Sequence, residues 1–135
     1  MATMSTTITA SGSFSLTDSN GITIFSYSPS FTTSSNTAGA IISTGEILTN
    51  GTSDTTINLG RHNKDRIFTF VKNVDTDYPV AVKPDGDVIA NLKPGECFFS
   101  PVDIDGAGDS SANLDLAATT AAQKVQYLLC DGLDN

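Results

Sequence analysis

The chain has 135 residues, of which 39% are hydrophobic and 16% are charged. This fits one domain with its own hydrophobic core and excludes a disordered acidic protein. Seven Lys and Arg against 15 Asp and Glu give a net charge of −8, which argues against direct binding of nucleic acid or of anionic membranes. No apolar run is long enough for a transmembrane helix, and the first ten residues show no secretory signal pattern.

The N-terminal part is neutral and rich in hydroxyl side chains, because residues 1–60 contain no Lys or Arg. We predict that residues 1–12 form an extended arm that adds a strand to a neighbouring subunit's sheet, with a frayed terminus as the alternative. Residues 13–135 are then expected to form the main domain. Apolar and polar residues alternate at 13–16 and 22–24, which predicts two strands around a turn.

The rest of the chain reads as short strands separated by turns. Residues 28–39 are too polar to decide between a loop, a weak strand and a flexible segment, and residues 117–123 fit a short helix or a loop. Turn sequences occur at Asn50-Gly51, at 84–87, where Pro84 presets one dihedral angle, and at 93–96. The predicted strands are 56–59, 66–72 (central and buried on both faces), 78–82, 88–92, 96–100, 113–116 and 124–130.

This pattern predicts an all-β protein. About eight to ten short strands with frequent turn signals indicate a single-domain antiparallel β-sandwich, jelly-roll-like in its arrangement. Cys97 and Cys130 both lie in apolar runs. We expect two small buried thiols, with a disulfide between the two strands as the alternative.

The residue types that carry catalysis are scarce. His62 is the single histidine, and it lies in a charged segment that reads as a solvated turn before the strand at 66–72. No nucleophile elbow, phosphate-binding loop or dinucleotide-binding fingerprint is present. The sequence therefore predicts a protein that is not an enzyme and that has no catalytic residues and no cofactor.

One acidic loop resembles a cation site. Asp103, Asp105 and Asp109 surround two glycines, and carboxylate oxygens on a tight loop are the ligands that Ca²⁺ prefers. The loop lacks a third oxygen ligand at Ala107 and the bidentate Glu of an EF-hand. An exposed acidic turn without metal is therefore the favoured interpretation, and Ca²⁺ binding is the alternative.

The segment from Ile67 to Leu129 resembles small β-sandwich structural proteins of tailed-bacteriophage virions. The resemblance lies in Phe70-Val71-Lys72-Asn73-Val74-Asp75, in the run from Val88 to Pro101 with its Leu92-Lys93-Pro94-Gly95-Glu96 turn, and in Val125-Gln126-Tyr127-Leu128-Leu129. It covers about half of the chain. Such proteins are often capsid decoration (cement) proteins, so the resemblance implies no catalytic residues.

From this resemblance we expect a virion structural protein, made in the host cytoplasm and placed on the outer capsid surface. Its expected partners are the major capsid protein or other virion proteins, together with further copies of itself in a homo-oligomer such as a trimer. A phage tail or fibre accessory is the alternative within the particle. A carbohydrate- or host-surface-binding module is a further alternative, for which Tyr27, Tyr78, Tyr127 and the acidic loop 103–109 would be the candidate residues.

Overall fold

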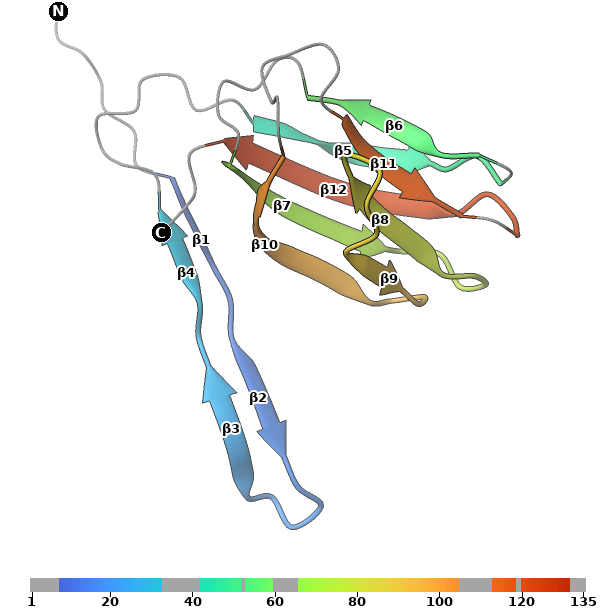
Figure 1. Ribbon diagram of the computed structural model, residues 1–135. Coiled ribbons are helices and arrows are strands. Elements are labelled where there is room, and N and C mark those ends of the chain that lie inside the picture. The colour runs from blue at the N-terminus through green and yellow to red at the C-terminus, as the bar shows by residue number, and fades with distance from the viewer. Residues whose placement is uncertain are drawn as a thin grey trace, which may run out of the picture.

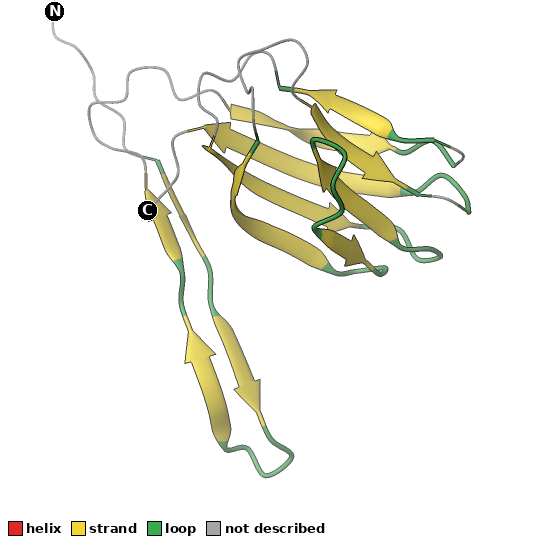
Figure 2. Cartoon of the chain, viewed as in Figure 1, coloured by secondary structure: helices red, strands yellow, loops and turns green. Residues whose placement is uncertain are grey.

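The fold is described from a computed structural model, for residues 8–32, 42–51, 53–59, 66–104, 113–118 and 120–131. These residues form twelve β-strands and no helix. Eight strands build two four-stranded sheets that face each other, and the other four build a long hairpin that projects from them (Figure 1). Every described strand pair is antiparallel. The predicted all-β sandwich is confirmed, and Figure 2 shows strands and connecting loops throughout these ranges.

The first sheet has the strand order β10-β7-β12-β5. Its members are β10 (Cys97–Asp103), β7 (Arg66–Asn73), β12 (Lys124–Asp131) and β5 (Ile42–Leu48). The two central strands are long, and β7 is rich in β-branched and aromatic residues, which favour the pleated conformation. Both faces of β7 are covered, since Ile67, Phe68 and Thr69 are all buried. This confirms the prediction of a doubly buried strand at 66–72.

The second sheet has the order β6-β11-β8-β9. It contains β6 (Thr55–Asn58), β11 (Asn113–Ala117), β8 (Val80–Pro84) and β9 (Ala90–Leu92). In β8 and β11 every second residue is buried, so each strand turns one face to the core. The core between the sheets is aliphatic, and its fully buried side chains include Leu59, Ile67, Val71, Val80, Val82, Ile104, Leu114, Leu116, Val125 and Leu129.

Proline occupies a different position in each of two predicted turns. At 93–96 the Glu96 amide donates to the Lys93 carbonyl, and Gly95 has φ 84°, so Pro94 presets the turn as predicted. At 84–87 the prediction was wrong in detail. Asp85 (φ 52°) and Gly86 (φ 88°) both have positive φ, and Pro84 is the last residue of β8. The turn is therefore of the primed hairpin type, set by Asp-Gly.

The N-terminal part departs from the sandwich. We call residues 8–32 the arm. Its proximal half pairs β1 (Thr9–Ser11) with β4 (Ser30–Thr32), and its distal half pairs β2 (Phe14–Thr17) with β3 (Thr23–Tyr27). Neither pair joins a four-stranded sheet (Figure 1). The expected boundary between an arm at 1–12 and a sandwich at 13–135 thus falls inside the hairpin, because 14–17 pair with 23–27 rather than with a sandwich strand.

Candidate interaction surface

The arm has one apolar face and one hydroxyl face. In the first limb, apolar residues or glycine occupy positions 8, 10, 12, 14 and 16, and Ser or Thr occupy every position between them. In the second limb, positions 25, 27, 29 and 31 are apolar and positions 26, 28, 30 and 32 are Ser or Thr. The register pairs Ala10 with Phe31 and Leu16 with Phe25. Because directly paired residues share a face, the apolar positions of both limbs lie together.

The proximal half of this apolar face is covered by the sandwich. Ile8, Ala10 and Phe31 pack against Phe68 and Cys130 of the first sheet. The Phe31 and Phe68 rings lie 5.5 Å apart between centroids, which is within the range of favourable aromatic pairs. This contact holds the base of the arm on the outer face of the β10-β7-β12-β5 sheet, the face turned away from the core.

The distal half of the apolar face has no cover on the described chain. Phe14, Leu16, Phe25 and Tyr27, which we call the apolar stripe, are 52–58% exposed. The rings of Phe14 and Phe25 lie edge to face, with their centroids 6.0 Å apart. Apart from each other, β2 and β3 pack extensively on no described strand. Ile22 and Ile24 nearby are 63% and 65% exposed. An exposed apolar cluster of this size usually marks a binding surface.

The tip of the arm is shaped by local hydrogen bonds. The Asp18 carboxylate accepts hydrogen bonds from the backbone amides of Asn20 (2.9 Å) and Ile22 (3.0 Å). The backbone amide of Gly21 donates to the backbone carbonyl of Asp18 (3.1 Å). Gly21 has φ 81°, a value that glycine adopts without strain. Asp18 is also the single Asp, Glu, Lys, Arg or His between residues 8 and 32. The arm is therefore stiffened at its tip and almost uncharged.

An apolar groove lies on the outer face of the first sheet, beside the base of the arm. Its volume is about 540 Å³, which is within the roughly 300–1,000 Å³ of typical binding pockets. Phe70, Phe99 and Leu128 line it from the sheet, and Gly12 and Phe31 line it from the arm. Phe99 is 40% exposed. The groove is a second place where apolar side chains of the described chain meet solvent.

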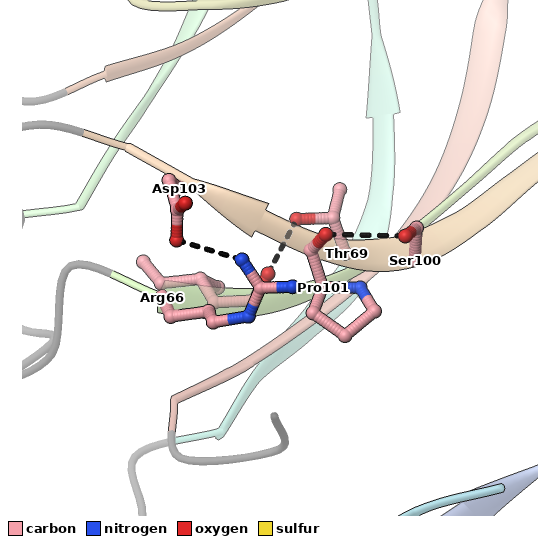
Figure 3. Close-up of polar contacts among 6 residues, drawn as sticks. Arg66, Thr69, Ser100, Pro101 and Asp103 are labelled. Carbon is pink, nitrogen blue, oxygen red and sulfur yellow. Dashed lines mark hydrogen bonds and ion pairs between the residues drawn. The ribbon is translucent and has the colours of Figure 1, made fainter. Parts of the chain in front are cut away.

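The acidic loop, whose alternative interpretation was a Ca²⁺ site, is described only in part. Asp103 lies at the end of β10, and its carboxylate forms an ion pair of 2.9 Å with Arg66, the first residue of β7 (Figure 3). Asp105, Asp109 and the candidate His62 lie outside the described residues. Within the part of the chain that the structure describes, no three His, Cys, Asp or Glu side chains come together as metal ligands. The ion pair between Asp103 and the Arg66 guanidinium on the neighbouring strand is an ordinary cross-strand contact.

The two cysteines occupy different environments. Cys130 is buried under the arm base, as predicted, but Cys97 is exposed at the start of β10, where it lines the groove. The expectation of a buried thiol was wrong for Cys97, because position 97 faces the outer side of the sheet rather than the core. The two residues are not joined by a disulfide, so that alternative is not observed.

The three tyrosines lie on separate elements. Tyr27 belongs to the apolar stripe on β3, Tyr78 precedes β8 and is 40% exposed, and Tyr127 on β12 packs partly into the core. Gly45 on the paired strand makes room for the Tyr127 ring, since a Cβ there would lie 3.3 Å from its hydroxyl. Tyr27 is thus the one tyrosine of the three that contributes to the arm surface.

Sequence reasoning did not identify the buried polar residues that fix one end of the sandwich. The Asn73 amide nitrogen donates to the carbonyls of Tyr78 (2.9 Å) and Leu92 (3.0 Å), and Gln123 accepts from the Tyr78 amide (3.2 Å). Asn73 and Gln123 are both buried. They satisfy backbone groups of the loop before β8 and of the last residue of β9, so they connect the two sheets. The signal that could have revealed this role is a small amide residue, Asn73, at the end of a strongly predicted strand.

The Asp75 carboxylate forms a related connection at the surface. It accepts from the backbone amides of Thr76 (2.8 Å) and Lys124 (3.1 Å), where it joins the end of β7 to the start of β12. These hydrogen bonds stabilise the ionised form and lower the pKa of Asp75, with a further contribution from the charge of Lys124.

Comparisons with known proteins give no relative: no family model, no curated protein and no solved structure matches this chain. Within the described ranges, no helix has the length and apolar character needed to cross a membrane.

Proposed function

We propose that this protein is a non-enzymatic structural protein of a tailed-bacteriophage virion, a capsid decoration protein that binds the major capsid lattice. The proposal takes the virion context from the resemblance of residues 67–129. One structural observation supports the docking role: the arm projects from the sandwich and presents an apolar stripe that no described part of the chain covers (Figure 1). An element that reaches beyond its own domain suits contact with neighbouring subunits of a lattice.

The chemistry of the arm suits a protein lattice better than a charged or sugar ligand. Its single Asp or Glu, Asp18, already accepts two backbone hydrogen bonds, so the arm offers few ionic contacts. Apolar side chains provide affinity when they leave water, and the Ser and Thr positions of the other face supply hydrogen bonds at the rim. Many identical copies on a lattice would add avidity to weak single contacts.

The test is binding of the purified protein to phage capsids that lack it. Wild-type protein should bind and should raise the temperature at which the capsids open. Leu16→Lys, which places a charge in the apolar stripe, should reduce binding at least about tenfold. Ser15→Lys adds the same charge on the opposite face of the same strand and is the matched control. Failure of the wild-type protein to bind the capsids would refute the proposal.

The copy number per particle separates the decoration role from its alternatives. Hundreds of copies indicate the capsid shell, and a dozen or fewer indicate a tail or fibre accessory. Binding to a glycan array instead of to capsids would favour the carbohydrate-binding module.

A further inference from the structure

We infer that the arm docks on a second copy of this chain, with the apolar stripe of each copy seated in the groove on the outer sheet face of the other. The second copy would cover the stripe in the free protein, whereas on a capsid the lattice would take its place, so the two contacts exclude each other at any one arm. The inference does not depend on the virion role. It rests on four observations: the continuity of the arm's apolar face, the area that this face exposes, its lack of charge, and the groove that remains open beside the arm base.

The continuity of the apolar face shows which kind of surface fits the stripe. The alternation of apolar and hydroxyl residues keeps its phase from Ile8 to Leu16 and from Phe25 to Phe31. At the proximal half this face rests on aromatic and aliphatic side chains of the outer sheet face, with Phe31 against Phe68. The distal half has the same pattern and therefore fits the same kind of surface. Another copy of the chain supplies that surface.

The exposed area approaches that of a specific contact when both copies take part. The stripe provides four large apolar side chains that are 52–58% exposed. At roughly 100 Å² each they expose about 400 Å², and each copy would also bury a comparable area of its own groove, against about 800 Å² per partner in a standard interface. A two-stranded hairpin is only marginally stable in water, and packing on a second layer stabilises it.

Between two copies of this chain, the charge distribution favours contact through this surface. Two copies of a chain with a net charge of −8 repel each other wherever their acidic surfaces approach. The arm has one carboxylate, at its tip, and the groove is lined by Thr, Ser, Ala, Gly, Phe, Cys and Leu without a charged residue. Contact through the arm and the groove thus brings together the uncharged parts of both copies.

The groove provides the opposite half of the contact. Phe70, Phe99 and Leu128 leave about 540 Å³ open where the arm base ends. The arm of the same chain leads away from this face (Figure 1), so the arm of another copy can occupy it. Two such contacts related by a two-fold axis would close a dimer in which each copy gives one arm and receives one.

The solution mass of the purified full chain tests the inference without any capsid. Sedimentation equilibrium across a concentration series should show self-association of the wild type. Leu16→Lys in the stripe and Phe99→Lys in the groove should each weaken it at least about tenfold. Ser15→Lys, on the hydroxyl face, should associate like the wild type. Circular dichroism of each variant checks that the sandwich is folded.

Mixing the two defective variants tests which surfaces meet. A Leu16→Lys copy keeps its groove and a Phe99→Lys copy keeps its arm, so a mixed pair has one intact contact and should associate more strongly than either variant alone. A wild type that is monomeric at tens of micromolar, an unaffected Leu16→Lys variant, or mixing without any gain would each overturn the inference. Self-association without capsid binding would refute the proposed function alone, and capsid binding by a monomer would refute this inference alone.

Discussion

The two halves of the arm have the same residue pattern but different surroundings. In the proximal half, Phe31 packs on Phe68, and the neighbouring Pro29 is buried. In the distal half, Phe25 and Tyr27 stand in the same alternation and remain more than half exposed. The comparison teaches that the alternation of apolar and polar residues specifies which face of a strand must be buried. Whether the same chain buries that face depends on where the strand lies relative to the sandwich.

The largest expected difference lies between a sandwich leucine and an arm leucine. Leu116 is fully buried in the core and Leu16 is half exposed in the stripe. Leu116→Ala should lower the free energy of unfolding by about 3 kcal/mol, because it creates a cavity. Leu16→Ala should change it by no more than about 0.5 kcal/mol in the monomer. Urea denaturation followed by circular dichroism measures both, and equal losses would show that the arm is part of the cooperative core.

A buried polar side chain should have the next largest effect. Asn73→Ala removes the donors that serve the carbonyls of Tyr78 and Leu92, which leaves buried groups unpaired. We expect a loss of about 2 kcal/mol in the free energy of unfolding. Asn91→Ala, at an exposed position of β9, is the control and should be close to neutral. A neutral Asn73→Ala would mean that these bonds do not hold the two sheets together.

The packing of the proximal half of the arm on the sheet can be removed without changing a residue of the core between the two sheets. Phe31→Ala takes away the ring that packs on Phe68. The local opening free energy of β1 and β4 should fall by about 1–2 kcal/mol, less than for a fully buried ring because Phe31 is partly exposed. Amide hydrogen exchange measures this change. Phe25→Ala in the distal half should leave exchange in β1 and β4 unchanged when the protein is monomeric.

The smallest expected effect is the pH dependence of the contribution that Asp75 makes to the stability of the sandwich. The pKa of Asp75 is lower in the folded chain than in the unfolded chain. Its contribution to stability is therefore fully present above the usual aspartate pKa of about 4, and it is lost as the pH falls through the lower folded value. The stability difference between wild type and Asp75→Ala should be constant near neutral pH and should shrink below about pH 4. A difference that grows on acidification would contradict this assignment.

Much of the sandwich can be predicted from the sequence. The β-branched and aromatic run at 66–73 and the segment 124–131, which contains no Gly or Pro, leave little choice but strands. Pro94-Gly95 dictates its turn. The arm could be predicted only in part. The alternation at 13–16 indicates a strand with one apolar face, but it carries no information on which segment pairs with that strand or covers that face. The polar stretch after residue 27 likewise conceals β4, whose single large apolar residue is Phe31.

The prediction for the surfaces failed for similar physical reasons. Cys97 lies in an apolar run with Phe98 and Phe99, but a run of three cannot show which residues face the core. In the structure Phe98 packs on the core, while Cys97 and Phe99 line the groove on the other side. The groove itself arises where the arm base meets the sheet, and local patterns do not encode such a tertiary contact.

The order of strands in the first sheet has a consequence for biosynthesis. β12 lies between β7 and β5, although it follows both in the sequence, and Leu128 pairs with Phe70 on one side and with Thr44 on the other. During translation the sheet cannot close until residue 131 has left the ribosome. The arm emerges before the sandwich strands and has no sandwich to rest on for most of that time. Its apolar residues are then a risk for aggregation, and we expect chaperones to raise the yield of soluble protein.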